Sequence, residues 1–116
     1  MAGWTLTVRR SGRTERSRHA SLRDAVSAME ARLDALAPGA SRRDERFLGR
    51  EFAAASLVEA RAELRGPRGV RGGVDLHADR STLPWTGRLR RRALDEAPGE
   101  TSYEALARVL GDGGGG

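Results

Sequence analysis

Apolar and polar side chains alternate at the start of the chain, where Trp4, Leu6 and Val8 are separated by threonines. A period of two is typical of a strand with one buried face. A Ser-Gly turn signal follows, and the next segment, RTERSRHA, is polar on both faces, as exposed edge strands often are. We therefore predict an N-terminal hairpin whose second strand lies at a sheet edge.

Two later segments have the apolar spacing of amphipathic helices. Ser21-Leu22-Arg23-Asp24 has the form of an N-cap, and Pro38-Gly39 is a stop signal. Thr101-Ser102-Tyr103-Glu104 repeats the capping-box form, and Gly111 is a natural C-cap. The apolar stripes of the two predicted helices are Leu22, Ala25, Val26, Met29, Leu33 and Leu36, and then Tyr103, Leu106, Ala107 and Leu110.

The region between the helices is less regular at its start. SRRDER, within residues 40–57, predicts a solvated loop. From residue 52 to residue 64 the even positions are mostly apolar, which favours a strand, although the same residues also form a helical stripe. Two clear alternations follow, at residues 70–79 and 83–89. Because these neighbours are strand-like, we predict three consecutive strands.

The alternation also restricts how these three strands pair. Facing residues of an antiparallel pair lie on the same side of the sheet. We predict that the first pair sets Arg61 opposite Asp75, because a shift of two residues would set Glu59 against Asp75. For the second pair we predict Trp85 opposite Leu76, so that Trp85 lies on the apolar side. Leu89 then also points into the core.

The predicted element order is ββαβββα. It describes an α+β domain over residues 1–111, in which an antiparallel sheet, made of the N-terminal hairpin and a three-stranded meander, packs both helices on one face. The glycine-rich end predicts a flexible tail at residues 112–116.

From residue 21 onward, this order resembles that of double-stranded RNA-binding domains. With the first strand included, it is also similar to ribosome-hibernation factors, whose final helix begins with a segment like Tyr103-Glu104-Ala105-Leu106. Here the last helix begins Glu100-Thr101-Ser102, where double-stranded RNA-binding domains place lysines against phosphates. We assign no family on element order alone.

The amino-acid composition excludes several kinds of functional site. The chain has 116 residues and no cysteine, which excludes disulfides, thiolate zinc sites and cysteine nucleophiles. All 21 of its basic Lys and Arg residues are arginines, and lysine, isoleucine and asparagine are absent, a pattern typical of a GC-rich bacterial genome. The choice of arginine over lysine is therefore weak evidence for bidentate recognition. The net charge of +5 still favours an acidic partner.

The positive charge is concentrated in two segments, residues 1–20 and 80–95, each with five arginines and one carboxylate. The predicted register sets Arg65, Arg71 and Arg90 side by side on the open face, with no carboxylate of the three strands to neutralise them. The alternatives are that these side chains are simply solvated, or that Asp95, Glu96 and Glu100 fold over them. The candidate anion or nucleic-acid site consists of Arg65, Arg68, Arg71, Arg88, Arg90 and Arg92.

Other motifs point to no catalytic chemistry. RGPRGVRGG lacks the ending of a phosphate-binding loop and precedes a strand, so it predicts a hairpin turn. His19 and His77 are too few for a metal-ligand set, and there is no nucleophile-elbow or HExxH motif. No apolar run reaches the roughly 20 residues of a membrane span. We expect a cytoplasmic protein that is not an enzyme and has no cofactor and no metal.

Two functional hypotheses follow. The first is a small non-catalytic binding protein that uses the basic end of its sheet against an acidic macromolecule, with RNA or the ribosome as the leading candidate. The alternative is a protein-protein interaction or self-associating module, in which an exposed edge strand pairs with another chain to give a homo-oligomer without nucleic acid.

Overall fold

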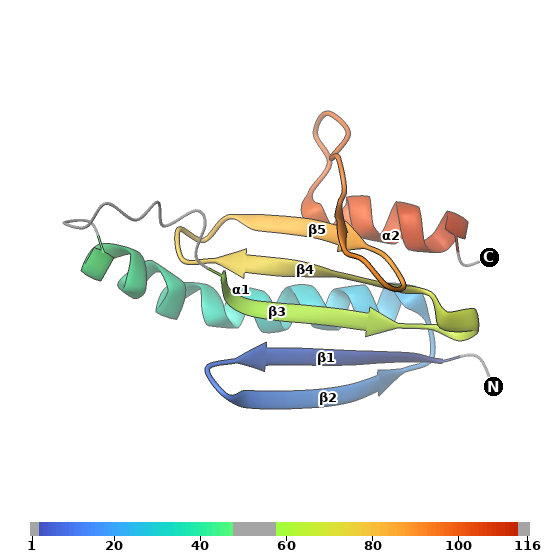
Figure 1. The fold of residues 1–116 in the computed structure, drawn as a ribbon, viewed down its shortest axis with the longest axis horizontal. Helices are drawn as coiled ribbons and strands as arrows, with labels where there is room; N and C mark the ends of the chain where they lie inside the picture. The colour runs from blue at the N-terminus through green and yellow to red at the C-terminus, as the bar shows by residue number, and fades with distance from the viewer. Residues whose placement is uncertain (1–2, 48–57, 114–116) are drawn as a thin grey trace.

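A computed structural model describes residues 3–47 and 58–113 of the chain (Figure 1). It confirms the predicted α+β class and the ββαβββα order, with a short sixth strand added before the last helix. In chain order the elements are β1 (Trp4–Arg10), β2 (Arg13–His19), α1 (Leu22–Phe47), β3 (Val58–Arg65), the 3-10 turn η2 (Pro67–Gly69), β4 (Arg71–His77), β5 (Thr82–Thr86), β6 (Arg92–Ala93) and α2 (Ser102–Gly113).

The strands form one antiparallel sheet in the order β2-β1-β3-β4-β5-β6. The N-terminal hairpin therefore lies beside β3, and β2 is an edge strand, as its polar sequence predicts. Figure 1 shows α1 and α2 on the same side of the sheet. We call the other side, which faces the viewer in Figure 1, the open face.

The core lies between the sheet and the two helices. Even-numbered side chains of β1, β3 and β4 point toward the helices, and Leu6 and Leu64 face each other across the β1–β3 pair. Both are buried, as is Leu106 of α2. Full burial of one such side chain stabilises the fold by about 1.5–3 kcal/mol. Gly72 lets α2 come close, because a Cβ there would lie 2.9 Å from the Leu106 Cδ1 atom.

Both helices begin where the capping signals predict. The Ser21 hydroxyl accepts a hydrogen bond from the Asp24 backbone N–H at 3.1 Å. At the second helix the bonds are reciprocal: the Thr101 hydroxyl accepts from the Glu104 N–H at 3.1 Å, and the Glu104 carboxylate accepts from the Thr101 N–H at 3.0 Å. Each bond satisfies a backbone donor that the first helical turn leaves unpaired.

The predicted helix ends are wrong. α1 continues through Pro38 to Phe47, so the SRRDER segment is helical and not a loop. Proline removes one backbone donor, but its fixed φ is compatible with a helix, so the stop signal is not absolute. α2 passes Gly111 and ends at Gly113, which places two residues of the predicted tail in the helix. Residues 48–57, with the first half of the predicted strand 52–64, and residues 114–116 lie outside the described residues.

The register of β3 with β4 is the predicted one, with Arg61 opposite Asp75 and an irregularity between Val58 and Ala60. The register of β4 with β5 is different from the prediction. Trp85 faces Gly73 and not Leu76. An odd shift moves every side chain of the strand to the other side of the sheet, so Trp85 lies on the open face.

Trp85 is nevertheless buried, with 2% of its surface exposed. Its indole lies against Gly73, where a Cβ would come within 2.7 Å of the Trp85 Cζ2 atom. The indole N–H donates to the Asp75 Oδ1 atom at 3.1 Å, which satisfies its only polar group. The guanidinium carbons of Arg71 and Arg91 lie 5.0 and 5.4 Å from the ring centroid. A glycine that makes room and a carboxylate that accepts the N–H together favour this register.

The end of β5 also differs from the prediction. The strand ends at Thr86, and the chain then forms a loop before β6. Gly87 begins this loop with a φ of +144°, a backbone conformation that residues other than glycine rarely adopt. Leu89 therefore lies in the loop and is 95% exposed, instead of pointing into the core. Arg91, next to β6, contacts Trp85 on the open face.

Candidate anion-binding face

Four of the six predicted arginines meet at one end of the sheet, in a group that we call the turn cluster. Arg65 ends β3 and Arg71 begins β4, directly opposite each other. Arg68 lies in the η2 turn that joins the two strands, with a φ of +61°. The Arg88 Nη2 group donates to the Arg68 carbonyl oxygen at 2.9 Å, which holds the 87–91 loop against the turn.

Arg90 and Arg92 are not part of the turn cluster. They line a hollow of about 500 Å³ within residues 86–92, which Arg88 of the turn cluster also lines. The predicted row of Arg65, Arg71 and Arg90 is therefore wrong in its third member, because β5 ends before it. Gly87 takes that place, and its backbone N–H donates to the Arg71 carbonyl oxygen at 3.1 Å.

A carboxylate neutralises part of the turn cluster, contrary to the sequence prediction. The Glu63 oxygens accept hydrogen bonds from the Arg65 Nε at 3.0 Å and the Arg71 Nε at 2.6 Å. The Glu63 side chain is 8% exposed, that of Arg71 20% and that of Arg65 67%. Burial opposes ionisation of Glu63, but the hydrogen bonds from Arg71 and Arg65 outweigh it and hold the pKa below the ordinary value of 4.5. Two guanidinium groups thus share one buried anion.

The carboxylates of Glu96 and Glu100 are bound elsewhere and do not neutralise this cluster. The Glu100 carboxylate binds Arg108 of α2 at 3.0 Å, and the Glu96 carboxylate accepts from the Ser102 hydroxyl at 2.6 Å. Both contacts are made with residues of α2. The alternative in which the C-terminal acids neutralise the arginines is therefore wrong for these two residues.

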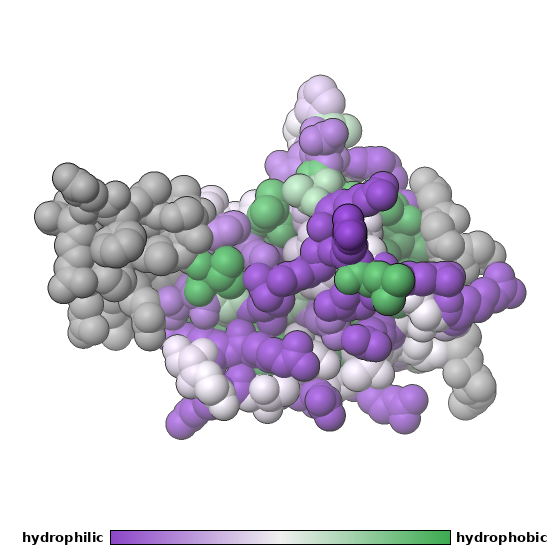
Figure 2. Space-filling view, in the orientation of Figure 1, coloured by the Kyte–Doolittle hydropathy of each residue, from purple (hydrophilic) through white to green (hydrophobic). Residues whose placement is uncertain are grey.

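The sheet order brings the N-terminal arginines onto the same face as the turn cluster. Thr5 of β1 pairs with Arg18 on one side and with Arg65 on the other, so Arg18, Arg65 and Arg71 lie in one row across four strands. Thr7 likewise joins Arg16 to Glu63. Figure 2 shows that hydrophilic residues cover most of this face.

Sequence reasoning missed these N-terminal arginines as site residues. Arg9, Arg16 and Arg18 are on the open face, and none has a side-chain partner among the residues that the structure describes. The signal in the sequence was the charge of residues 1–20 together with the polar edge strand. Those features predict exposure, but they do not say which strand the hairpin adjoins.

The centre of the face holds a second buried carboxylate. As predicted, Arg61 faces Asp75, and its Nε and Nη2 groups donate to the two carboxylate oxygens at 3.0 and 3.3 Å. Asp75 also accepts the Trp85 N–H. Asp75 is thus bound to groups of its own face, as Glu63 is. Neither acid neutralises the N-terminal arginines.

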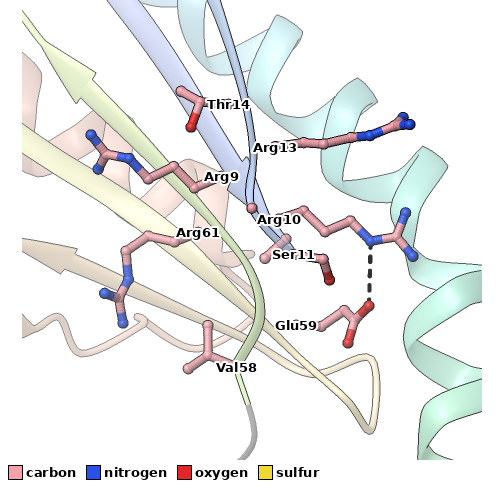
Figure 3. A pocket seen from close by; sticks show the side chains of 10 residues that line it. Arg9, Arg10, Ser11, Arg13, Thr14, Val58, Glu59 and Arg61 are labelled. Atoms are coloured by element: carbon pink, nitrogen blue, oxygen red, sulfur yellow. Dashed lines mark hydrogen bonds and ion pairs between the residues drawn. The ribbon is translucent and has the colours of Figure 1, made fainter.

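A hollow of about 380 Å³ lies at the opposite end of β1 and β3 from the turn cluster (Figure 3). In this view Arg9 and Arg61 extend to one side, and Arg10 and Arg13 to the other. The Arg10 Nε group forms an ion pair with the Glu59 Oε1 atom at 3.3 Å. Arg9 and Arg61 are direct partners in the β1–β3 register and carry the positive charge at this end of the open face.

Comparison with known proteins finds no matching family, curated protein or solved structure. Within residues 3–47 and 58–113, no group of three or more metal-ligating side chains is placed to hold an ion. In the same ranges neither helix is long and apolar enough to cross a membrane. Function is therefore inferred from the open face itself.

Proposed function

We propose that this is a small, cytoplasmic, non-catalytic binding protein whose open sheet face contacts an acidic macromolecule, with RNA as the leading candidate. One observation carries the proposal: the row of Arg18, Arg65 and Arg71, which continues into Arg16 and Arg9 on the same face. Glu63 already binds Arg65 and Arg71, but Arg9, Arg16 and Arg18 have no side-chain partner among the described residues. A polyanion would supply that partner.

Glu63 and Asp75, the two buried carboxylates of the open face, support binding and not catalysis. Glu63 accepts hydrogen bonds from two arginines, and Asp75 accepts from Arg61 and Trp85. A general base must have a lone pair within reach of a substrate proton. These oxygens are bound to groups of the protein instead, so they position the arginines of the open face.

The alternative function, self-association through an edge strand, receives less support. β2 is an exposed edge seven residues long, but Arg13, Glu15, Arg16 and Arg18 occupy four of those positions. Charged side chains on an edge oppose pairing with a second chain. Light scattering at high protein concentration tests this alternative, since it requires a dimer and the proposed function is compatible with a monomer.

A salt series with matched variants tests the proposed function. Fluorescence anisotropy would measure binding of a labelled, structured RNA between 50 and 200 mM salt. About six phosphate contacts should lower the affinity roughly 10³-fold over this range, because binding releases counterions. Replacing Arg16 and Arg18 by serine should reduce the slope of log affinity against log salt by about two.

The control replaces Arg23 and Arg80 by serine. It removes the same net charge, but Arg23 lies on α1 and Arg80 in the turn between β4 and β5. This control should bind RNA with the unaltered slope. Equal slopes for the two variants would show that the open face is not the binding surface.

A further inference from the structure

Two basic rows cross the open face, separated by one row of different character. We call Arg18, Arg65 and Arg71 the near row, and Arg9 with Arg61 the far row. Between them, Arg16 and Glu63 lie at either side of Thr7. When Glu63 is counted with the near row that it binds and Asp75 with Arg61, both outer rows stay positive, and Arg16 is the one charge left in the middle row.

The spacing of these rows follows from strand geometry. Arg61 and Arg65 are four residues apart on β3. At about 3.3 Å per residue, the two basic rows are about 13 Å apart along the strands. The middle row includes Gly73, which has no side chain, and Thr7, which is 7% exposed. The Trp85 ring lies over Gly73 and is 2% exposed, so the centre of the face is filled by Thr7 and Trp85, which are both uncharged.

The open face offers no stacking platform for unpaired bases. Proteins that bind single strands without sequence preference use exposed aromatic rings. Trp85 is the aromatic residue of this face within the described part of the chain, and Arg71 and Arg91 cover it. The face presents guanidinium groups instead. Such groups can contact the phosphates on the outside of a duplex, in which the bases face inward.

Two lines of cations with an uncharged centre between them match two phosphate backbones separated by a groove. The major groove of B-form DNA is about 12 Å wide and about 8.5 Å deep, and it admits a helix or a two-stranded ribbon. A six-stranded sheet is too broad to enter it. The minor groove of A-form RNA is wide and shallow and is recognised by shape and by contacts to phosphates and 2′-hydroxyls. A broad sheet face can lie across that groove.

We propose that the open face binds double-stranded RNA, with the near row on one phosphate backbone and the far row on the other, across the shallow minor groove. The inference rests on the proposed function and specifies its partner. It requires both rows for binding, whereas a general anion site requires only one.

The experiment compares three labelled probes of one sequence: a 20-base-pair RNA duplex, its single strand and the DNA duplex. Duplex RNA should bind at least tenfold tighter than either competitor at the same salt. Arg18→Ser in the near row and Arg9→Ser in the far row should each lower the salt slope for duplex RNA by about one, and the double variant by about two. Arg80→Ser is the control.

These positions suit the test because neither Arg9 nor Arg18 has a side-chain partner among the described residues, and thermal melting would verify that each variant stays folded. If one melts lower, the glutamine variant at that position replaces it. Equal binding of single-stranded RNA or of duplex DNA would overturn the inference and leave the proposed function standing. An Arg9→Ser variant with unchanged binding would overturn the two-row arrangement. Binding of none of the three probes would overturn both proposals.

Discussion

Replacing Glu63 by glutamine is the sharpest test of how the open face is held together. The substitution keeps the shape of the side chain but removes its charge. The carboxylate presents an acceptor oxygen to each of two Nε donors, those of Arg65 and Arg71. Glutamine has one acceptor oxygen and an NH₂ group, so one guanidinium would face a donor in place of an acceptor.

The cost follows from the exposure of the three side chains. Hydrogen bonds to charged groups contribute about 1.5–3 kcal/mol each when both partners are buried. Arg65 is 67% exposed and can regain its bond from water, whereas Arg71 is 20% exposed and Glu63 is 8% exposed. We therefore count mainly the Arg71 contact and expect Glu63→Gln to lower the free energy of unfolding by about 2 kcal/mol.

Urea unfolding followed by tryptophan fluorescence would measure this loss, since both Trp4 and Trp85 are buried. For slopes of about 1–3 kcal/mol per molar urea, a loss of about 2 kcal/mol lowers the midpoint by roughly 0.7–2 M. Glu30→Gln is the control, because Glu30 is exposed on α1 and should change stability by less than about 0.5 kcal/mol. If Glu63→Gln moved the midpoint no more than this control, Glu63 would not hold the arginines as argued.

Three further predictions test the site and the fold. Because the pKa of Glu63 is lowered in the folded state, its ionised form stabilises the fold above about pH 4.5, and this contribution is lost as the pH falls through the folded-state pKa. The difference in urea midpoint between the natural protein and Glu63→Gln should therefore shrink between about pH 5 and pH 2. A constant difference would contradict this. Gly73→Ala would place a Cβ 2.0 Å from the Ala62 carbonyl oxygen and 2.7 Å from the Trp85 side chain, so we expect the free energy of unfolding to fall by about 3 kcal/mol or more. Thermal unfolding would measure this, and a melting temperature within a few degrees of that of the natural protein would refute the β4–β5 register. Thr101→Ala should cost about 1 kcal/mol because it removes the helix cap, while Thr101→Ser should retain most of that stability in the same assay.

The parts of the fold that the sequence predicts correctly are those decided by neighbouring residues. The caps at Ser21 and Thr101 depend on bonds within one helical turn. The β3–β4 register depends on a short turn and on one pair of opposite charges, Arg61 and Asp75. In each case the interacting groups are close in sequence, so their chemistry is enough to place them.

The predicted β5 register is wrong because the alternating apolar residues of this strand do not face the helices. Trp85 instead lies on the open face, where Gly73 makes room for its ring and Asp75 accepts its N–H. Glycine in the middle of a strand often marks a close approach by another group. That signal was present in the sequence, but it competes with the simpler expectation that tryptophan belongs in the main core.

The candidate site was predictable only in its local part. Arg65, Arg68 and Arg71 belong to one hairpin, so their meeting follows from the turn. Arg18 joins them because β1 inserts between β2 and β3, a choice of strand order that no local pattern determines. The same alternation in β1 would have been satisfied at the other edge of the sheet, far from the turn cluster.

The arginines of the open face form two groups, which differ in whether a buried carboxylate binds them. Arg61, Arg65 and Arg71 are anchored by the buried carboxylates Glu63 and Asp75, which stabilise the sheet from within. Arg9, Arg16 and Arg18 have no such anchor among the described residues, so their mutual repulsion is relieved only by solvent, salt or a ligand. A polyanion that contacts both groups would bind guanidinium groups that are already ordered in the first group, and would neutralise unpaired positive charges in the second. For this reason we place the binding surface across the whole face and not at the turn cluster alone.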